Sequence, residues 1–165
     1  MGQRGISFLY SFCFFARVGG AEKDIDMFLG EFTHKLDSKG RLTIPTKFRG
    51  QLSQGLVVTR GLDPCLAIYP LEEWQQLSAK VSALPITDRV ARAFRRLVFA
   101  NASFSTLDGQ GRVLIPPRLR EEAGLDTQVI VTGLDTYIEL WSPENWEAEQ
   151  ARVVGDEEMW AALEI

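Results

Sequence analysis

The sequence predicts an α+β fold built from a duplicated module of β-hairpins and short helices. Two ten-residue segments repeat, alternating apolar and polar residues indicate strands, and apolar residues at helical spacing indicate helices between them. The first repeated segment, LDSKGRLTIP, spans residues 36–45, and the second, LDGQGRVLIP, spans residues 107–116. Their shared pattern is L-D-x-x-G-R-x-x-I-P, which makes the repeat the dominant feature of the chain.

The period of the repeat is close to 70 residues. Six positions of the pattern match at an offset of 71, and at an offset of 72 Gly61-Leu62-Asp63 parallels Gly133-Leu134-Asp135 and Trp74 parallels Trp146. Two copies at this period favour a duplicated small module over a solenoid. A module of about 45 residues buries too little surface to be stable alone. The copies are therefore expected to pack into one β-rich body with an internal pseudo-two-fold axis.

The chain is expected to divide into five segments. They are a poorly ordered extension over 1–26, a first repeat over 31–74, a helical connector over 75–101, a second repeat over 102–146 and an acidic tail over 147–165. The extension has an apolar run behind Arg4, as an export signal would, but Arg17 interrupts the run and residues 18–20 make a poor cleavage site. An upstream start codon is the favoured interpretation.

The first copy opens with an expected strand from Phe28 to Leu36. Asp37-Ser38-Lys39-Gly40 is typical of a tight turn, since Asp bonds backbone amides two residues on and Gly adopts positive φ. A second strand, Arg41 to Ile44, completes the expected hairpin and presents Lys39 and Arg41 at its tip. Pro45 ends the strand and opens a short helix to about Leu52.

A second hairpin and two helices follow. Strands are expected at Leu56–Arg60 and Cys65–Tyr69, and Pro70 opens a helix with a stripe of five apolar residues: Leu71, Trp74, Leu77, Val81 and Leu84. Thr87 is expected to cap a helix to about Phe99. Its buried face is expected to be Val90, Phe94 and Leu97. Three interpretations of its basic stripe, Arg89, Arg92 and Arg96, stay open: a solvated face, subunit salt bridges or phosphate contact.

The second copy repeats this order. Strands are expected at 102–107, 112–115, 128–132 and 137–141, with the turn at 108–111, a helix over 117–123 and a last helix from Pro143 through Trp146. The aromatic residues Trp74, Phe94 and Trp146 are expected in the core or in a subunit contact.

Charge is distributed unevenly along the chain. The formal net charge is −4, yet residues 144–165 hold seven acidic residues and one basic residue. Residues 35–49 hold five basic residues and one acidic residue, Asp37. The positive field is therefore local, and it coincides with the first repeated turn.

The repeated turns are the candidate binding sites. Asp37 can hold the Arg41 guanidinium or cap the turn amides, and an anchored Arg fork is suited to phosphate or a guanine edge. The structural alternative is an ion pair that only shapes the hairpin. Duplication shifts the balance toward binding, since a two-fold body suits repeated DNA half-sites. The candidate DNA-binding residues are Lys39, Arg41, Gln110 and Arg112, and the turn-organising residues are Asp37, Gly40, Asp108 and Gly111.

Other residue types give little support to catalysis. His34 is expected to be a buried, hydrogen-bonded neighbour, and Cys65 a small apolar residue in a strand. The two cysteines suggest neither a disulfide framework nor a metal site, which favours a reducing cytosol. A hydrolase using Asp37 or Asp108 has no visible nucleophile-base set. No cofactor, metal, membrane or small-molecule substrate is expected.

The sequence resembles the MraZ family of bacterial transcriptional regulators, within the AbrB-like swapped-hairpin barrel superfamily. The resemblance runs from Met27 to about Glu147 and rests on GEFTHKLDSKGRLTIPTKFR, VVTRGLDPCLAIYPLEEW, ARAFRRLVFANAS and LDGQGRVLIPPRLREEAGL. Its signature is the pair of D-x-x-x-R elements, here Asp37 to Arg41 and Asp108 to Arg112. The extension before Met27 departs from the family pattern.

This resemblance implies a DNA-binding repressor in the cytoplasm, associated with the nucleoid and assembled into ring-like homo-oligomers. It would recognise short direct repeats in a promoter upstream of cell-division and cell-wall genes, with Arg41 and Arg112 reaching double-stranded DNA. Because Gln110 replaces Lys39 in the second copy, the first turn is expected to contribute more. The rival interpretation is a ring-forming protein-interaction module without specific DNA binding. The operator, ring size and role of the acidic tail stay open.

Overall fold

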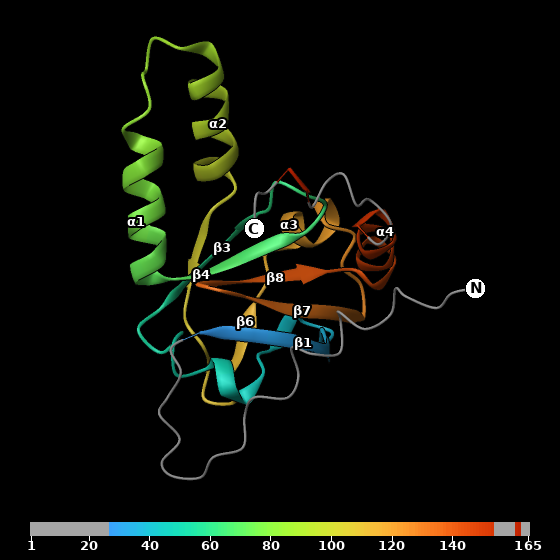
Figure 1. Ribbon diagram of the computed structural model, residues 1–165. Helices are drawn as coiled ribbons and strands as arrows, with labels where there is room; N and C mark the ends of the chain where they lie inside the picture. Colours follow the sequence, from blue (N-terminus) through green and yellow to red (C-terminus); the bar gives the residue numbers. More distant parts are fainter. Residues whose placement is uncertain (1–26, 154–160, 163–165) are drawn as a thin grey trace, which may run out of the picture.

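The protein folds into a six-stranded antiparallel sheet, a two-stranded sheet and helices at the periphery, an α+β arrangement as expected (Figure 1). The computed structural model describes residues 27–153 and 161–162. The strands of the first copy are β1 (Phe28–Lys35), β2 (Arg41–Thr43), β3 (Leu56–Arg60) and β4 (Leu66–Pro70). Those of the second are β5 (Ser103–Ser105), β6 (Arg112–Leu114), β7 (Gln128–Asp135) and β8 (Tyr137–Trp141).

The strand order of the larger sheet interleaves the two copies. The order is β1-β7-β8-β4-β3-β5, and every pairing in it is antiparallel. Exchanging each strand with its counterpart in the other copy gives the same order read from the opposite edge. The first strand of each copy thus pairs with the second hairpin of the other copy, and β4 and β8 join the halves at the centre.

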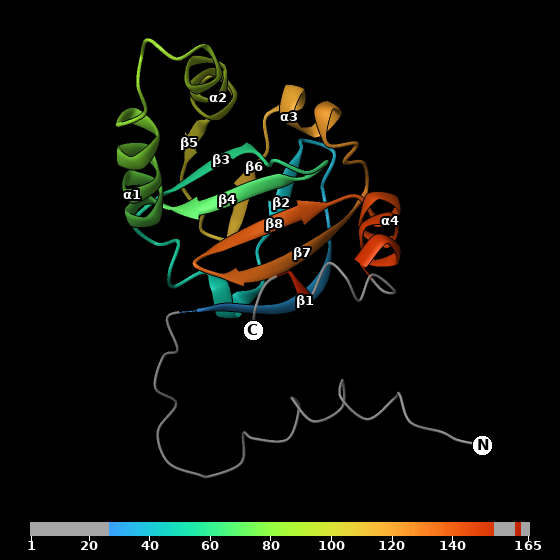
Figure 2. The same cartoon turned by 45° about the horizontal axis from the view of Figure 1, so that its top comes forward.

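The prediction that β1 and β2 form a hairpin was wrong. Beyond the turn, β1 and β2 share only a single bridge, Leu36 with Leu42, and β2 pairs instead with β6 of the other copy. The apolar residues of the two short strands explain this choice. Leu42 and Val113 are both fully buried and face each other in the β2–β6 register. This small sheet lies behind the six-stranded sheet in the view of Figure 2.

The hydrophobic core fills the space between the two sheets and takes residues from both copies. It holds Leu42, Ile44 and Phe48 from the first copy and their counterparts Val113, Ile115 and Leu119 from the second. The short helices after each turn supply part of it, since η2 (Thr46–Phe48) contributes Phe48 and α3 (Pro117–Glu122) contributes Leu119. Each copy therefore lacks a complete core without the other, as the size of the module predicted.

Two longer helices form an arm that projects from the edge of the sheet (Figure 1). They are α1 (Leu71–Ser82) and α2 (Arg89–Ala100). The cap of α2 is Asp88, whose side chain accepts from the Val90 amide, and not Thr87 as predicted. The predicted inner face was wrong at Val90, which is 75% exposed, whereas Phe94 and Leu97 are half-buried and the buried residues are Ala91 and Val98. An arm that meets the body at one end buries only a narrow stripe.

The arginines of α2 do not form one free stripe. Arg92 Nη1 donates to the carbonyl oxygens of Ile86 and Thr87, at 2.8 and 3.0 Å. Arg95 Nε donates to the Val81 carbonyl at 3.2 Å. These two side chains therefore tie α2 to the end of α1 and to the loop between the helices, which weakens the phosphate-contact interpretation of Arg92.

Several element boundaries also differ from prediction, and the helix expected to run from Pro45 to about Leu52 is reduced to the three residues of η2. The strand expected at 102–107 is reduced to the three residues of β5, β7 extends to Asp135, and α4 (Pro143–Val153) runs seven residues beyond Trp146 into the predicted acidic tail. The predicted extension over 1–26 and most of the tail lie outside the described residues. Within the described part of the chain, no helix combines the length and the apolar character needed to cross a membrane.

Candidate functional site

The first repeated turn is organised by the carboxylate of Asp37. Its Oδ1 accepts from the backbone amides of Lys39 and Arg41, both at 2.9 Å, and its Oδ2 accepts from Arg41 Nε at 2.7 Å. The turn closes through the Gly40 amide, which donates to the Asp37 carbonyl at 2.9 Å. Gly40 has φ of +77°, a conformation that costs other residues strain. One carboxylate thus shapes the loop and aims the guanidinium.

The second turn reproduces this geometry. Asp108 Oδ1 accepts from the amides of Gln110 and Arg112 at 2.9 Å, and its Oδ2 accepts from Arg112 Nε at 2.8 Å. Gly111 has φ of +72°. The sequence left open whether the aspartate holds the arginine or caps the turn, and in both copies it does both.

Strands β2 and β6 bring the two turns side by side. The Ile44 amide donates to the Gly111 carbonyl, and the Ile115 amide donates to the Gly40 carbonyl, both at 2.9 Å. Arg112 Nη1 also lies 3.8 Å from Asp37 Oδ2 in the other turn. Residues that are 71 apart in the sequence therefore form one surface. The sequence could not show this proximity, because an alternating pattern does not name a strand's partner.

The charged groups of this surface keep partial contact with solvent. The side chains of Arg41 and Arg112 are 31% and 23% exposed, and Lys39 and Gln110 are exposed beside them. Ion pairs that are partly exposed to solvent contribute little to stability. Their main effect is to restrict each guanidinium to a narrow range of directions, which reduces the side-chain entropy lost when it contacts a ligand.

Both aspartates remain ionised over the physiological pH range. The backbone amide of Arg41, followed by its side chain, lowers the pKa of Asp37. The backbone amide of Arg112, followed by its side chain, lowers the pKa of Asp108 to about 2. The carboxylates therefore hold both turns in this geometry throughout the physiological pH range.

A second pair of arginines supports the turns and was not singled out from the sequence. Arg49 Nε donates to the Ile44 carbonyl at 2.9 Å, and Arg120 Nε donates to the Ile115 carbonyl at 3.1 Å. Arg49 lies against Gly111 and Arg120 lies against Gly40, so each contacts the turn of the other copy. Both obey the offset of 71, the one signal that could have found them.

The remaining titratable residues offer no second constellation. His34 is half-buried, less than predicted, and burial followed by the nearby charge of Arg49 lowers its pKa. Cys65 is buried, as predicted, and burial raises the pKa of its thiol above the range in which it would react. Among the residues that the structure describes, no group of three or more histidine, cysteine or carboxylate side chains is placed to bind a metal ion.

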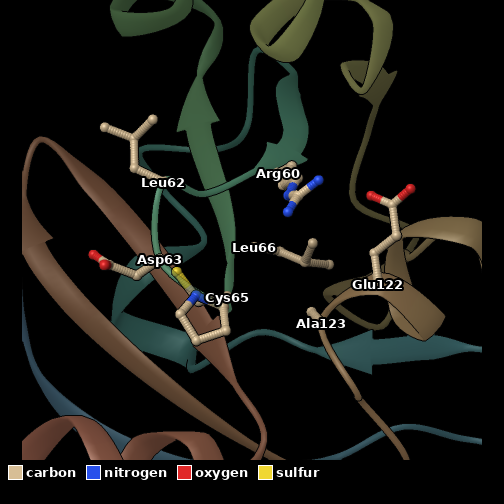
Figure 3. A pocket seen from close by; sticks show the side chains of 8 residues that line it. Arg60, Leu62, Asp63, Cys65, Leu66, Glu122 and Ala123 are labelled. Carbon is tan, nitrogen blue, oxygen red and sulfur yellow. The ribbon is translucent and has the colours of Figure 1, made fainter.

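A small pocket lies beside the turn that joins β3 to β4. It measures about 230 Å³ and lies between Arg60, Asp63, Cys65, Leu66 and Glu122 (Figure 3). In this view Asp63 and Glu122 lie on opposite sides, with Leu66 between them. Ligand pockets usually measure roughly 300 to 1,000 Å³ and contain a few polar groups that point toward one position in the pocket. This pocket does neither, so the paired turns are the better candidate site.

Comparison with known proteins agrees with the duplicated signature. The family described as "MraZ protein, putative antitoxin-like" matches residues 27–97 and again residues 98–159. The chain is 55% identical over 123 residues to a protein of Thermomicrobium roseum named transcriptional regulator MraZ, covering 74% of this chain and 87% of that protein.

Two further proteins with the same name are similar over most of their length. One from Herpetosiphon aurantiacus is 54% identical over 121 residues, covering 73% of this chain and 85% of that protein. One from Acetivibrio thermocellus is 48% identical over 135 residues, covering 82% and 92%. Since two matches to one family span nearly all the described residues and these relatives are about half identical, the chain belongs to the MraZ family of transcriptional regulators.

Proposed function

We propose that this protein is a sequence-specific DNA-binding repressor without enzymatic activity. The observation that carries the proposal is the pair of Asp-anchored arginine turns side by side on one surface, with Lys39 exposed next to them. Each guanidinium is held by a carboxylate through Nε, and Nη1 of Arg112 also lies 3.8 Å from Asp37 Oδ2 in the other turn. An oriented fork of this kind matches the O6 and N7 edge of guanine or a phosphate oxygen.

The proposed target is a set of short direct repeats in the promoter of a cell-division and cell-wall gene cluster. One good bidentate contact discriminates by about 1 to 3 kcal/mol, whereas useful specificity requires about 4 to 10 kcal/mol. A single pair of turns supplies about 2 to 6 kcal/mol, which reaches only the lower part of this range. We therefore infer a ring-like homo-oligomer that aligns several pairs with successive repeats, at the nucleoid in the cytoplasm.

We further infer that the fold is a swapped-hairpin arrangement of the AbrB-like type formed within one chain. The pairings of β1 with β7, β5 with β3 and β2 with β6 support this interpretation, because each copy completes its strands with those of the other. In this arrangement the two turns share a pseudo-two-fold axis. Turns related by a two-fold axis would by themselves match an inverted repeat, so successive subunits of the ring, and not the two turns of one chain, are proposed to match the direct repeats.

The test is a titration of labelled duplexes by fluorescence anisotropy. The protein's own upstream region and a scrambled duplex of equal length and composition are compared at several salt concentrations. The proposal predicts tighter binding to the upstream region and a log-log salt slope of about −0.9 for each phosphate neutralised. Equal binding to both duplexes, or none, would contradict it. Ring formation without DNA binding would favour the rival function, a protein-interaction module.

A further inference from the structure

We propose that Arg49 and Arg120 are positioning residues that act across the duplication, each holding the proposed DNA-reading turn of the other copy. The inference rests on the proposed function for its consequence on DNA, but the cross-copy contact itself is a property of the free protein. Arg49 belongs to the first copy and contacts the second turn at Gly111, and Arg120 belongs to the second copy and contacts the first turn at Gly40.

Each of these arginines is fixed at its stem within its own copy. The Nε atoms donate to the carbonyls of Ile44 and Ile115, the residues directly after the short strands β2 and β6. Those same two residues donate their amides to Gly111 and Gly40. Ile44 is therefore a common anchor for Arg49 and for the second turn, and Ile115 is a common anchor for Arg120 and for the first. Each arginine is thus held on the glycine that its anchor contacts.

The absence of a glycine side chain creates the space that each guanidinium occupies. A Cβ built on Gly40 would lie 2.6 Å from Cζ of Arg120, and one built on Gly111 would lie 2.6 Å from Cδ of Arg49. These distances are shorter than any van der Waals contact. The glycine of the repeated pattern thus serves two purposes, positive φ and close approach of an arginine from the other copy.

Arg49 and Arg120 can position the DNA-reading arginines because each contacts the glycine that comes directly before one of them. Gly40 and Gly111 immediately precede Arg41 and Arg112, so a shift of either glycine moves the guanidinium proposed to reach DNA. The aspartate fixes the arginine from one side of the turn, and the arginine of the other copy covers the glycine. Substitution of Arg49 is therefore expected to disturb Arg112 more than Arg41, and substitution of Arg120 to disturb Arg41 more than Arg112.

The first test uses free protein and two-dimensional amide spectra. In Arg49→Ala the Gly111 and Arg112 amide resonances are expected to shift more than those of Gly40 and Arg41, and in Arg120→Ala the order is expected to reverse. Arg118→Ala is the matched control, because Arg118 lies on the same helix as Arg120 but is exposed and pairs with Glu122. If the alanine variants fail to fold, Arg49→Gln and Arg120→Gln replace them. Larger shifts in each arginine's own copy would overturn the inference.

The second test is a double-mutant cycle on DNA from the protein's own upstream region. Arg49→Ala is expected to weaken binding by on the order of tenfold in an otherwise unchanged protein and much less when Arg112 is already Ala. Its effect should persist when Arg41 is Ala. Equal effects in the two backgrounds would overturn the cross-copy assignment. If the unchanged protein binds no DNA, the proposed function fails, while the amide spectra still decide this inference.

Discussion

The two copies of the module share their turn geometry but differ in the strands that lead into the turns. In the first copy, β1 pairs with β7 over eight residues, and Phe28 is fully buried against Phe48. In the second copy, β5 pairs with β3 over three residues, and Phe104 is 63% exposed. The hydrogen bonds of Asp37 and Asp108 nevertheless agree to within 0.1 Å. The two copies thus share the geometry of the turn, but the strand before the turn is shorter and less buried in the second copy.

The largest expected difference between the copies is in stability. Phe28→Ala empties a core site where the rings of Phe28 and Phe48 meet edge to face at 5.2 Å, and we expect it to lower the free energy of unfolding by about 3 to 5 kcal/mol. Phe104→Ala should change it by no more than about 0.5 kcal/mol. Urea denaturation of both variants measures the contrast. A comparable loss for Phe104→Ala that grows with protein concentration would show that assembly covers β5.

The turn glycines should respond alike in the two copies. We expect Gly40→Ala and Gly111→Ala each to lower the free energy of unfolding by about 1 to 2 kcal/mol because of positive φ, and the added Cβ to displace the arginine of the other copy. Gly109→Ala is the control, because a Cβ there meets no atom within 4 Å. Thermal denaturation measures all three. A neutral effect at Gly40 or Gly111 would show that the turn is not held as described.

The two turns differ in charge at one position, which is Lys39 in the first turn and Gln110 in the second. Exchanging these residues tests whether the turns contribute unequally to DNA binding. Lys39→Gln should reduce the magnitude of the log-log salt slope by about 0.9, and Gln110→Lys should increase it by about 0.9, if these positions contact phosphate. Anisotropy titrations at several salt concentrations measure the slopes. Unchanged slopes in both variants would place positions 39 and 110 away from the DNA backbone.

The smallest expected effect is on pH dependence. The pKa of Asp108 is lowered to about 2, and that of Asp37 is also lowered. A lowered carboxyl pKa contributes stability that is present above the unfolded pKa of about 3.9 and is lost as the pH falls toward the folded value. The ¹³C chemical shift of the Asp108 side-chain carboxyl, followed from pH 7 to pH 1.5, should therefore show this group ionised at pH 4. Protonation of Asp108 near pH 4 would mean that the turn amides do not hold it.

Much of the local structure could be predicted from the sequence because local rules govern it. The bounds of β3 and β8 were confirmed, since a short run rich in β-branched, aliphatic or aromatic residues between turn residues indicates a strand directly. The turns follow D-x-x-G-R because Asp accepts backbone amides and Gly adopts positive φ.

The sequence predicted the β3–β4 and β7–β8 hairpins, whose strands are adjacent in the chain, but not the pairings between the two copies. The partner of β2 is 71 residues away, and alternation specifies a face but not a partner. Val90 was misassigned to the inner face of α2 because it continues the regular stripe of Phe94 and Leu97, yet the arm contacts the body only near its base. The roles of Arg49 and Arg120 were missed because they arise from the β2–β6 pairing.

The most direct test of the central claim compares binding by Arg41→Ala, Arg112→Ala and the double variant to DNA from the protein's own upstream region. Each single substitution should raise the dissociation constant by roughly 5- to 150-fold, equivalent to about 1 to 3 kcal/mol, with the larger effect at Arg41. The melting temperature should change little, because exposed ion pairs contribute little to stability. Unchanged affinity, or an affinity loss that only follows unfolding, would return both arginines to a structural role and contradict the account.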